Sequence, residues 1–295
     1  MSAEDPRLAA LRDLLAEAAA ADGQDPVDES VHLRLKHQGL DGTDLWTDGA
    51  ADGPWDGVAL RHEGALDLVV RPGARGRGVG SGLAAQALAA PGEVTAWSHG
   101  HHPAAARIAT AQGLERVRDL WVMRRPVGPA APPLPEVAPA PGVRLGHWRD
   151  GWEPDPEAET AALLAVNGAA FAHHPEQGGM DRADLAARMA EDWFDPSGLL
   201  LATDEATGDL LGFHWTKQHS STLGEVYVVG IAPAAQGRGL GRTLTLAGLH
   251  HLAGRGVGEV LLYVESDNAP AVAVYSRLGF DHADVDTHVM YRRPA

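Results

Sequence analysis

Hydrophobic positions in the second half of the chain recur at two spacings, one typical of helices and one typical of strands. The helical spacing predicts helices over residues 157–171, 182–193, 242–254 and 269–278. Short apolar runs predict strands over residues 199–202, 210–216, 225–231, 259–265 and 286–292. A series of strands that is interrupted by one helix after residue 231 and by another before the last strand predicts a mixed α/β sheet.

The first half has the same order of apolar segments, and its match to the second half centres on a repeated glycine-rich phrase. The phrase occupies residues 75–80 and again residues 236–241, each time between an apolar strand and an apolar helix. The strand residues 68–70 and 229–231 precede it at the same distance, and a proline follows each strand by two residues. An ordered set of matches of this kind predicts two copies of one fold.

A proline- and alanine-rich stretch separates the two copies. Residues 126–142 alternate proline and alanine without a helical or strand period, which is typical of a stiff, extended linker. A chain of 295 residues has room for two domains that each bury a core. We therefore expect an N-terminal domain over residues 1–127, a linker over 128–142 and a C-terminal domain over 143–295.

Composition narrows the choice of partner and compartment. The chain has 24 Lys and Arg against 40 Asp and Glu, and this net charge of -16 disfavours nucleic acid and anionic membranes as partners. The absence of cysteine excludes a disulfide framework and thiolate metal sites. Charged residues within the helical pattern of residues 1–22 argue against a signal peptide or a membrane span. We expect a soluble, cytoplasmic, monomeric protein.

The glycine-rich loops point to a phosphate-bearing ligand. Backbone N–H groups that open a helix and are not covered by side chains form a cradle for phosphate oxygens. Because the chain is acidic, the arginines of these loops are better explained as local phosphate ligands than as part of a basic surface.

Three motifs in the second half resemble the GNAT acyl-CoA N-acyltransferases. They are the phrase at residues 236–241, Asn268 on the loop after the next strand, and Tyr-x-x-Leu-Gly-Phe at residues 275–280. The resemblance implies two tandem GNAT domains, each a mixed, mostly antiparallel sheet flanked by helices. It also implies acetyl-CoA as the co-substrate and an acyltransferase activity in the second copy.

By this resemblance, the donor site comprises a strand segment, the glycine-rich loop and the start of a helix. In the second copy these are Val229, Gly230, Ile231, Gln236, Gly237, Arg238, Gly239, Leu240, Gly241, Arg242, Asn268, Ala269, Pro270, Ala271, Val272 and Ala273. In the first copy they are Leu68, Val69, Val70, Arg75, Gly76, Arg77, Gly78, Val79 and Gly80. We expect the pyrophosphate on the loop N–H groups and the pantetheine arm paired with the strand backbone.

Two side chains of the second copy are candidates for proton transfer. Glu225 starts the strand that leads into the loop and is expected to act as general base through water, although a solvated strand-end carboxylate is the structural alternative. Tyr275 lies two helical turns after Asn268 and is expected to protonate the departing thiolate, with an ordinary core tyrosine as the alternative. Counting back through the repeat places Gly64 and Ala109 at these positions, so we expect the first copy to be non-catalytic.

Three further phrases, at residues 171–177, 224–230 and 262–268, resemble those tandem members that acetylate the cysteinyl amine of Cys-GlcN-inositol, the last step of mycothiol biosynthesis. The acceptor residues that this closer resemblance implies are Glu29, Glu176, Lys217, Glu225 and Tyr263. Glu29 is equally well explained as a carboxylate at a helix start, and Lys217 as a solvated edge lysine.

Two other functions remain open on the sequence. The acceptor could be another small amine, such as an aminoglycoside, a polyamine or a peptide N-terminus. Alternatively, the chain could bind acetyl-CoA as a sensor without turnover, although Glu225 and Tyr275 favour an enzyme. His99, His101 and His102 could ligate a metal, but no carboxylate or cysteine completes a site, and we expect no metal.

Overall fold

The computed structural model describes residues 5–148, 156–172 and 178–294. These residues form two compact units, each assembled from more than one stretch of the chain. Unit 1 consists of residues 1–121, 265–267 and 283–295, and unit 2 of residues 122–264 and 268–282.

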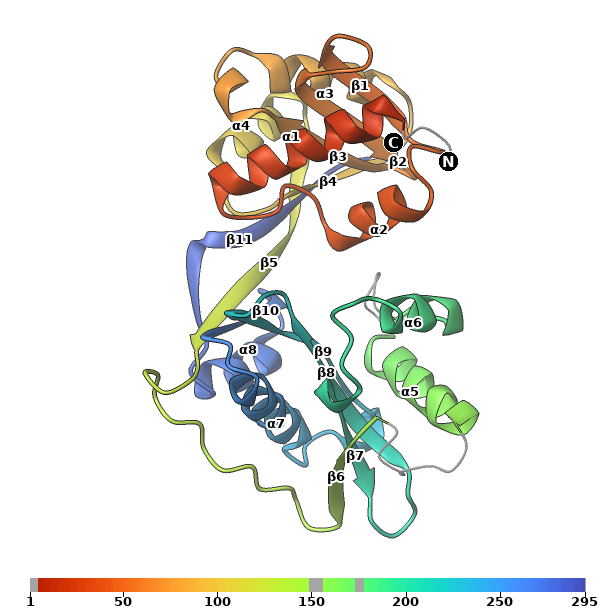
Figure 1. Cartoon of the computed structure of the whole chain (residues 1–295), viewed down its shortest axis with the longest axis vertical. Helices are drawn as coiled ribbons and strands as arrows, with labels where there is room; N and C mark the ends of the chain where they lie inside the picture. The colour runs from red at the N-terminus through yellow and green to blue at the C-terminus, as the bar shows by residue number, and fades with distance from the viewer. Residues whose placement is uncertain (1–4, 149–155, 173–177, 295) are drawn as a thin grey trace. The chain divides into compact units, whose positions relative to one another are not determined.

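Unit 1 begins with two helices, continues with three antiparallel strands and ends in strands separated by helices (Figure 1). Its elements are α1 (Pro6–Asp22), α2 (Glu29–His37), β1 (Asp44–Gly49), β2 (Trp55–His62), β3 (Ala65–Val70), η1 (Pro72–Ala74), α3 (Val79–Ala89), β4 (Val94–Ser98), α4 (Pro103–Ala111) and the start of β5 (Glu115–Pro126). Most of β11 (Asp281–Arg293), the last strand of the chain, also belongs to this unit.

The sheet of unit 1 is covered by helices on both faces, because the residues of its strands alternate between two cores. Val58 and Leu60 of β2 pack with α1 and α2, whereas Ala59 between them packs with Leu83 of α3. The strand order is β1-β2-β3-β4-β11-β5. Residues 289–293 of β11 pair antiparallel with residues 94–98 of β4, so the C-terminal strand lies inside this sheet.

From α5 onward, unit 2 repeats the order of helices and strands of unit 1, with β6 and η2 as additional elements. It contains β6 (Val143–His147), α5 (Pro156–Ala170), α6 (Arg182–Met189), η2 (Pro196–Gly198), β7 (Leu199–Asp204), β8 (Leu210–Gln218), β9 (Leu223–Ile231), η3 (Pro233–Ala235), α7 (Leu240–Gly254), β10 (Glu259–Glu265) and α8 (Ala269–Arg277). The strand order is β10-β9-β8-β7-β6, and only the β9–β10 pair is parallel.

Helices cover both faces of the unit 2 sheet, with α5 and α6 on one side and α7 and α8 on the other in Figure 1. Phe213 and Trp215 of β8 pack with Leu163 of α5 and Leu185 of α6. The intervening His214 faces α7, where its ring lies against Gly248. This packing confirms the mixed α/β sheet that the apolar pattern predicts, and the strand pairs confirm the mostly antiparallel arrangement that the GNAT resemblance implies.

Most predicted boundaries of the second half lie within two residues of the observed ones, and two elements, α6 and β11, differ by four or more. The helix expected over 182–193 ends at Met189, and Trp193 packs against Trp215 and Tyr227 instead of continuing the helix. The last strand begins at Asp281 rather than 286, because its first residues follow the turn that ends α8.

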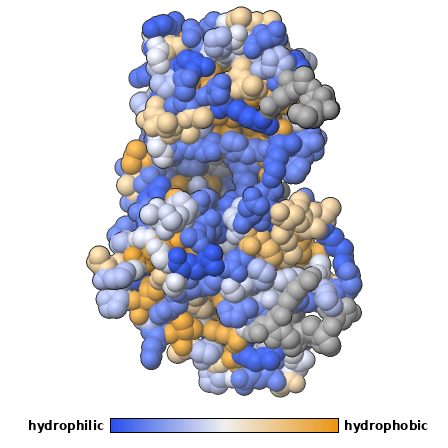
Figure 2. Space-filling view, viewed as in Figure 1, coloured by the Kyte–Doolittle hydropathy of each residue, from blue (hydrophilic) through white to orange (hydrophobic). Residues whose placement is uncertain are grey.

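The surface of the molecule has the mixture of residues expected of a highly charged chain. Figure 2 shows hydrophilic residues over most of the visible face, with smaller hydrophobic areas between them. Across the described residues, no helix has the length and apolar character needed to cross a membrane.

Candidate active site

The two glycine-rich loops have the same backbone conformation. Gly76 and Gly78 have φ values of 75° and 90°, and Gly237 and Gly239 have values of 79° and 76°. Side-chain-bearing residues rarely adopt this left-handed region, which explains why glycine occurs at matching positions in both copies. A Cβ atom at Gly237 or Gly239 would meet nothing within 4 Å, so the loop backbone faces open space.

The helices that follow these loops begin without a side-chain cap. Gly78 precedes α3 and Gly239 precedes α7, and neither helix start receives a hydrogen bond from a capping side chain. By contrast, Asp28 caps α2 and Asn268 caps α8. The first N–H groups of an α-helix need partners. At α3 and α7 they are available to an anion.

The arginines of the loops are not equivalent. In unit 1, Arg75 donates to both carboxylate oxygens of Asp22 at 2.6 and 2.8 Å and to the carbonyl of Val70 at 3.1 Å. In unit 2, Arg238 and Arg242 are exposed and have no ion pair within the described residues. Arg77 of unit 1, the counterpart of Arg238 in the repeat, is likewise exposed and has no ion pair among the described residues. The predicted role as a phosphate ligand therefore fits Arg77, Arg238 and Arg242 better than Arg75, whose counterpart is Gln236.

The strands next to each loop separate before they end. In unit 2, residues 259–262 of β10 pair with residues 223–226 of β9, after which β9 continues to Ile231 without pairing to β10. In unit 1, the parallel pairing of β3 with β4 consists of Ala65 with Thr95. Residues 229–231 and 68–70, which the sequence assigns to pantetheine, lie on the strand segments that leave their parallel neighbours.

Glu225 lies one residue before the point at which β9 leaves β10. Its side chain is buried, with 5% of the residue exposed, and Lys217 of β8 is its cross-strand neighbour. Oε2 of Glu225 lies 2.6 Å from Nε2 of His219. The solvated strand-end carboxylate considered as an alternative is therefore wrong, because Glu225 is buried and hydrogen-bonded.

Lys217 is also buried, with 8% exposed, rather than solvated at a sheet edge. Its ammonium nitrogen lies 4.7 Å from the ring centroid of Trp193 and 5.2 Å from that of Tyr227. Arg188 of α6 donates to the hydroxyl of Tyr227 at 3.2 Å. Cations over aromatic faces are attracted by the ring quadrupole, so this cluster fixes a positive charge beside Glu225.

Tyr275 is on α8, where burial raises its pKa to about 12. Its ring contacts that of Phe280 edge-on, with the centroids 6.0 Å apart. Asn268, two turns earlier, accepts a hydrogen bond from the N–H of Ala271 at 3.2 Å. Asn268 thus acts as the cap of α8, and residues 269–273 of the predicted donor site form the first turns of this helix.

The remaining acceptor candidates lie in different parts of the chain. Tyr263 follows the last β9–β10 pair by one residue and is 43% exposed, so it flanks the same opening as Glu225. Glu29 lies in unit 1 in the first turn of α2, where Asp28 is the cap. Glu176 is outside the described residues.

The sheet register corrects one detail of the comparison between the copies. Trp215 pairs with Val228 while Thr216 pairs with Val226, so Tyr227 is an extra, bulged residue in β9. The β2–β3 pair has no such bulge, and its pair of His62 with Ala65 corresponds to Lys217 with Glu225. The counterpart of Glu225 is therefore Ala65 rather than Gly64, since simple counting ignores the bulge. Unit 1 still has no carboxylate there.

The histidines of unit 1 that were considered as metal ligands make separate contacts. Burial lowers the pKa of His99, whose ring meets that of His288 edge-on at 4.9 Å. Nδ1 of His102 instead accepts from the N–H of Ala104 and caps α4. Among the described residues, no group of three or more potential ligands could hold a metal ion.

Comparison with known proteins agrees with this geometry. The Acetyltransferase (GNAT) family profile matches residues 169–280. A mycothiol acetyltransferase of a Nocardioides species is 53% identical over 97% of this chain and 97% of its own. The mycothiol acetyltransferase of Nocardia farcinica is 50% identical over 94% of this chain and 91% of its own.

Two solved structures share the fold. A tandem GNAT protein from the clavulanic acid biosynthesis pathway has a TM-score of 0.70 at 22% identity, covering 98% of this chain and 95% of its own. A GCN5-related N-acetyltransferase from Sphaerobacter thermophilus has a TM-score of 0.68 at 24% identity, covering 96% and 91%. Both copies have a helix that starts without a side-chain cap beside two diverging strands. Since relatives of about 50% identity also match nearly the whole length of the chain, it belongs to the mycothiol acetyltransferase family of tandem-GNAT acyltransferases.

Proposed function

We propose that this protein transfers acetyl from acetyl-CoA to the cysteinyl amine of Cys-GlcN-inositol, the last step of mycothiol biosynthesis. The proposal rests on the position of Glu225. This side chain is buried and lies one residue before β9 separates from β10, in the same unit as the uncapped start of α7. The names of the relatives support the acceptor. A cytoplasmic, monomeric enzyme remains part of the proposal.

The residues of unit 2 fit acetyl-CoA as donor. The pyrophosphate would lie on the N–H groups of residues 236–242, with Arg238 and Arg242 exposed beside it. The amides of pantetheine would pair with residues 229–231, which have no partner on β10. An N–H of the same segment can donate to the oxyanion that forms when the thioester carbonyl is attacked.

Glu225 would remove a proton from the acceptor ammonium, directly or through one water. An α-amino group titrates near pH 8, so a single positioned carboxylate suffices to produce the neutral nucleophile. The neutral amine then attacks the thioester carbon, and the nitrogen of the tetrahedral intermediate releases its second proton to water. The carbonyl re-forms to give the amide as the carbon–sulfur bond breaks with its electron pair on sulfur.

Tyr275 would stabilise the departing thiolate. With a pKa of about 12, its hydroxyl keeps its proton at neutral pH and can donate a hydrogen bond. A thiol titrates near pH 8.5, well below Tyr275, so complete proton transfer from the tyrosine would be uphill. We therefore propose that Tyr275 acts chiefly as a hydrogen-bond donor to sulfur, and that the proton reaches the thiolate from water when transfer is required.

Acceptor recognition would use Lys217 and Tyr263 of unit 2 together with Glu29 and Glu176. Lys217 is fixed over the Trp193 and Tyr227 rings, and Tyr263 flanks the strand opening. Unit 1 would be non-catalytic, because Ala65 and Ala109 replace the two proton-handling side chains.

The test measures release of free CoA thiol with Cys-GlcN-inositol beside polyamines, aminoglycosides and peptides. We expect a strong preference for the conjugate. Glu225→Gln should lower kcat by about 10²- to 10⁴-fold while acetyl-CoA binding, measured by calorimetry, stays intact. Glu205→Gln, an exposed residue in the β7–β8 turn, is the matched control and should behave as wild type. Turnover with another amine only, or undiminished turnover by Glu225→Gln, would contradict the proposal.

A further inference from the structure

Among the described residues, one hydrogen bond reaches the side chain of Glu225, and the proposed chemistry does not use it. A carboxylate can only accept, so the ring N–H of His219 donates to Oε2 across 2.6 Å. Within the described residues, Oε1 of Glu225 has no hydrogen-bond partner. His219 thus holds one oxygen of a buried carboxylate and leaves the other available.

The turn that carries His219 is itself hydrogen-bonded throughout. The N–H of His219 donates to the carbonyl of Leu223 at 2.9 Å, and the N–H of Ser220 donates to the same carbonyl at 3.2 Å. The hydroxyl of Ser220 accepts from the N–H groups of Thr222 and Leu223 at 3.2 and 3.1 Å. These bonds close the β8–β9 connection into one defined conformation.

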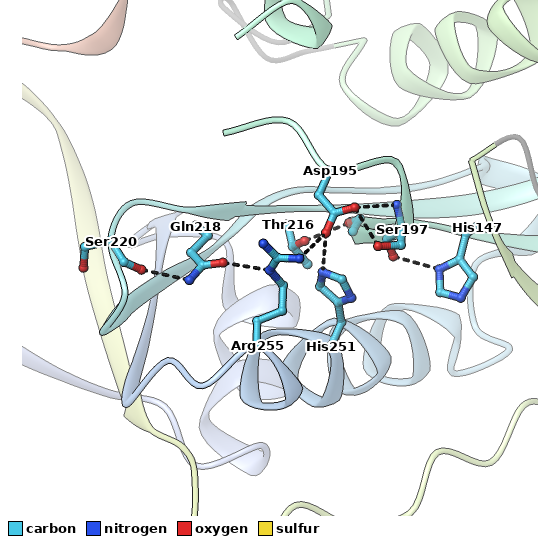
Figure 3. Close-up of polar contacts among 9 residues, drawn as sticks. His147, Asp195, Ser197, Thr216, Gln218, Ser220, His251 and Arg255 are labelled. Atoms are coloured by element: carbon cyan, nitrogen blue, oxygen red, sulfur yellow. Dashed lines mark hydrogen bonds and ion pairs between the residues drawn. The ribbon is translucent and has the colours of Figure 1, made fainter. Parts of the chain in front are cut away.

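A polar network anchors the start of this turn to α7 (Figure 3). Asp195, just before η2, accepts from Nη1 of Arg255 at 2.9 Å, and Nε of Arg255 donates to Oε1 of Gln218 at 2.8 Å. Nε2 of Gln218 donates to the carbonyl of Ser220 at 3.0 Å. His251 joins the same carboxylate of Asp195 at 3.5 Å. Gln218, on one side of His219, is therefore tied to Arg255 at the C-terminal end of α7, and Ser220, on the other side, is tied to Gln218.

We propose that His219 is a positioning residue for Glu225: its ring N–H fixes Oε2, so that Oε1 is the oxygen that receives the proton from the acceptor amine. A glutamate side chain has three rotatable bonds, and a buried general base must keep its reactive oxygen within hydrogen-bond reach of its substrate. A donor on a braced turn supplies that constraint without touching the substrate. This inference rests on the proposed role of Glu225 as general base.

The test compares His219→Ala, His219→Gln, Glu225→Gln and the double variant His219→Ala/Glu225→Gln. His219→Ala should lower kcat by about 10- to 100-fold, the usual effect of losing a hydrogen bond to a charged group, with KM for acetyl-CoA changed less than about 3-fold. His219→Gln keeps an N–H donor and should recover most of the lost kcat. In the double variant, loss of His219 should have no further effect, because the base on which it acts is absent.

His250→Ala is the matched control. His250 lies on α7, is exposed, and bonds the carbonyl of Pro135, so its loss should leave kcat unchanged. Thermal unfolding of each variant separates a folding defect from a catalytic one. The inference is overturned if His219→Ala turns over as wild type, if only KM rises, if His219→Gln is as slow as His219→Ala, or if the two losses multiply in the double variant. Undiminished turnover by Glu225→Gln alone would instead remove the proposed base, which is a separate outcome.

Discussion

Gly248 lies where α7 packs on the sheet of unit 2, and its replacement by alanine should destabilise that unit. A Cβ atom there would overlap the ring of His214 and lie 3.0 Å from Cγ2 of Thr216. Carbon atoms pack at about 3.5 to 4.0 Å, so α7 has to move away from β8. His214 cannot simply rotate, because its Nδ1–H donates to the carbonyl of Leu244 on the same helix at 2.8 Å.

The expected change in the free energy of unfolding is the sum of two destabilising contributions and one stabilising contribution. Overpacking of a filled core costs about 1 to 3 kcal/mol. Loss of the buried hydrogen bond from His214 adds about 1 kcal/mol, and the better helix propensity of alanine returns about 1 kcal/mol. We therefore expect Gly248→Ala to lower the free energy of unfolding by about 2 kcal/mol and Tm by about 4 to 8 °C.

The assay is thermal and urea unfolding of Gly248→Ala beside Gly254→Ala. Gly254 is on the same helix, and a Cβ there would meet nothing within 4 Å. Helix propensity then acts alone, so Gly254→Ala should be neutral or stabilising by up to about 1 kcal/mol. Affinity for acetyl-CoA should fall only in Gly248→Ala, since α7 starts at the glycine-rich loop. If Gly248→Ala is as stable as Gly254→Ala, the packing argument is refuted.

Two further predictions follow from shifted pKa values. In unit 1, burial and then the nearby Asp28 raise the pKa of Asp67 to about 7, whereas an unfolded aspartate titrates near 4, so stability should fall as pH rises between these values. At pH 8, Asp67→Asn should therefore raise the free energy of unfolding by about 1 to 2 kcal/mol relative to wild type, which thermal unfolding would show as a higher Tm. At pH 4 the substitution should have no such effect, and an equal effect at both pH values would contradict this prediction. In unit 2, burial raises the pKa of Tyr275 to about 12, so wild-type kcat should show no loss from tyrosine ionisation up to pH 9. Tyr275→Phe should lower kcat by about 10- to 100-fold with unchanged affinity for acetyl-CoA, and full activity would rule out its role.

The elements and loops of the fold could be predicted from the sequence, because local patterns determine them. Apolar spacing located β10 at residues 259–265, the bounds that the structure has. The glycines at 76, 78, 237 and 239 are required by local backbone conformation, so the repeat was visible without any long-range information. The duplicated order of strands and helices then follows from the same pattern.

Two features of the candidate site were not predicted from the sequence, because both depend on how β8 pairs with β9. The bulge at Tyr227 shifts the register by one residue, and no local signal distinguishes it from a regular strand position. His219 was missed because its partner lies across a turn, and a histidine near a strand end has no sequence pattern of its own. The pairing of β8 with β9, which composition does not reveal, brings the ring N–H of His219 to the carboxylate of Glu225.

The pairing of β11 with β4 has a consequence for the order in which the protein can be made. Domains that are contiguous in sequence can fold while the rest of the chain is still being synthesised. Unit 1 cannot complete its sheet in this way, because residues 289–293 lie between β4 and β5 and are synthesised after the residues of unit 2. Deleting these residues should disturb the N-terminal unit, although its strand β4, with which they pair, ends at Ser98. A segment that is synthesised after unit 2 thus completes a sheet whose other strands are synthesised before unit 2.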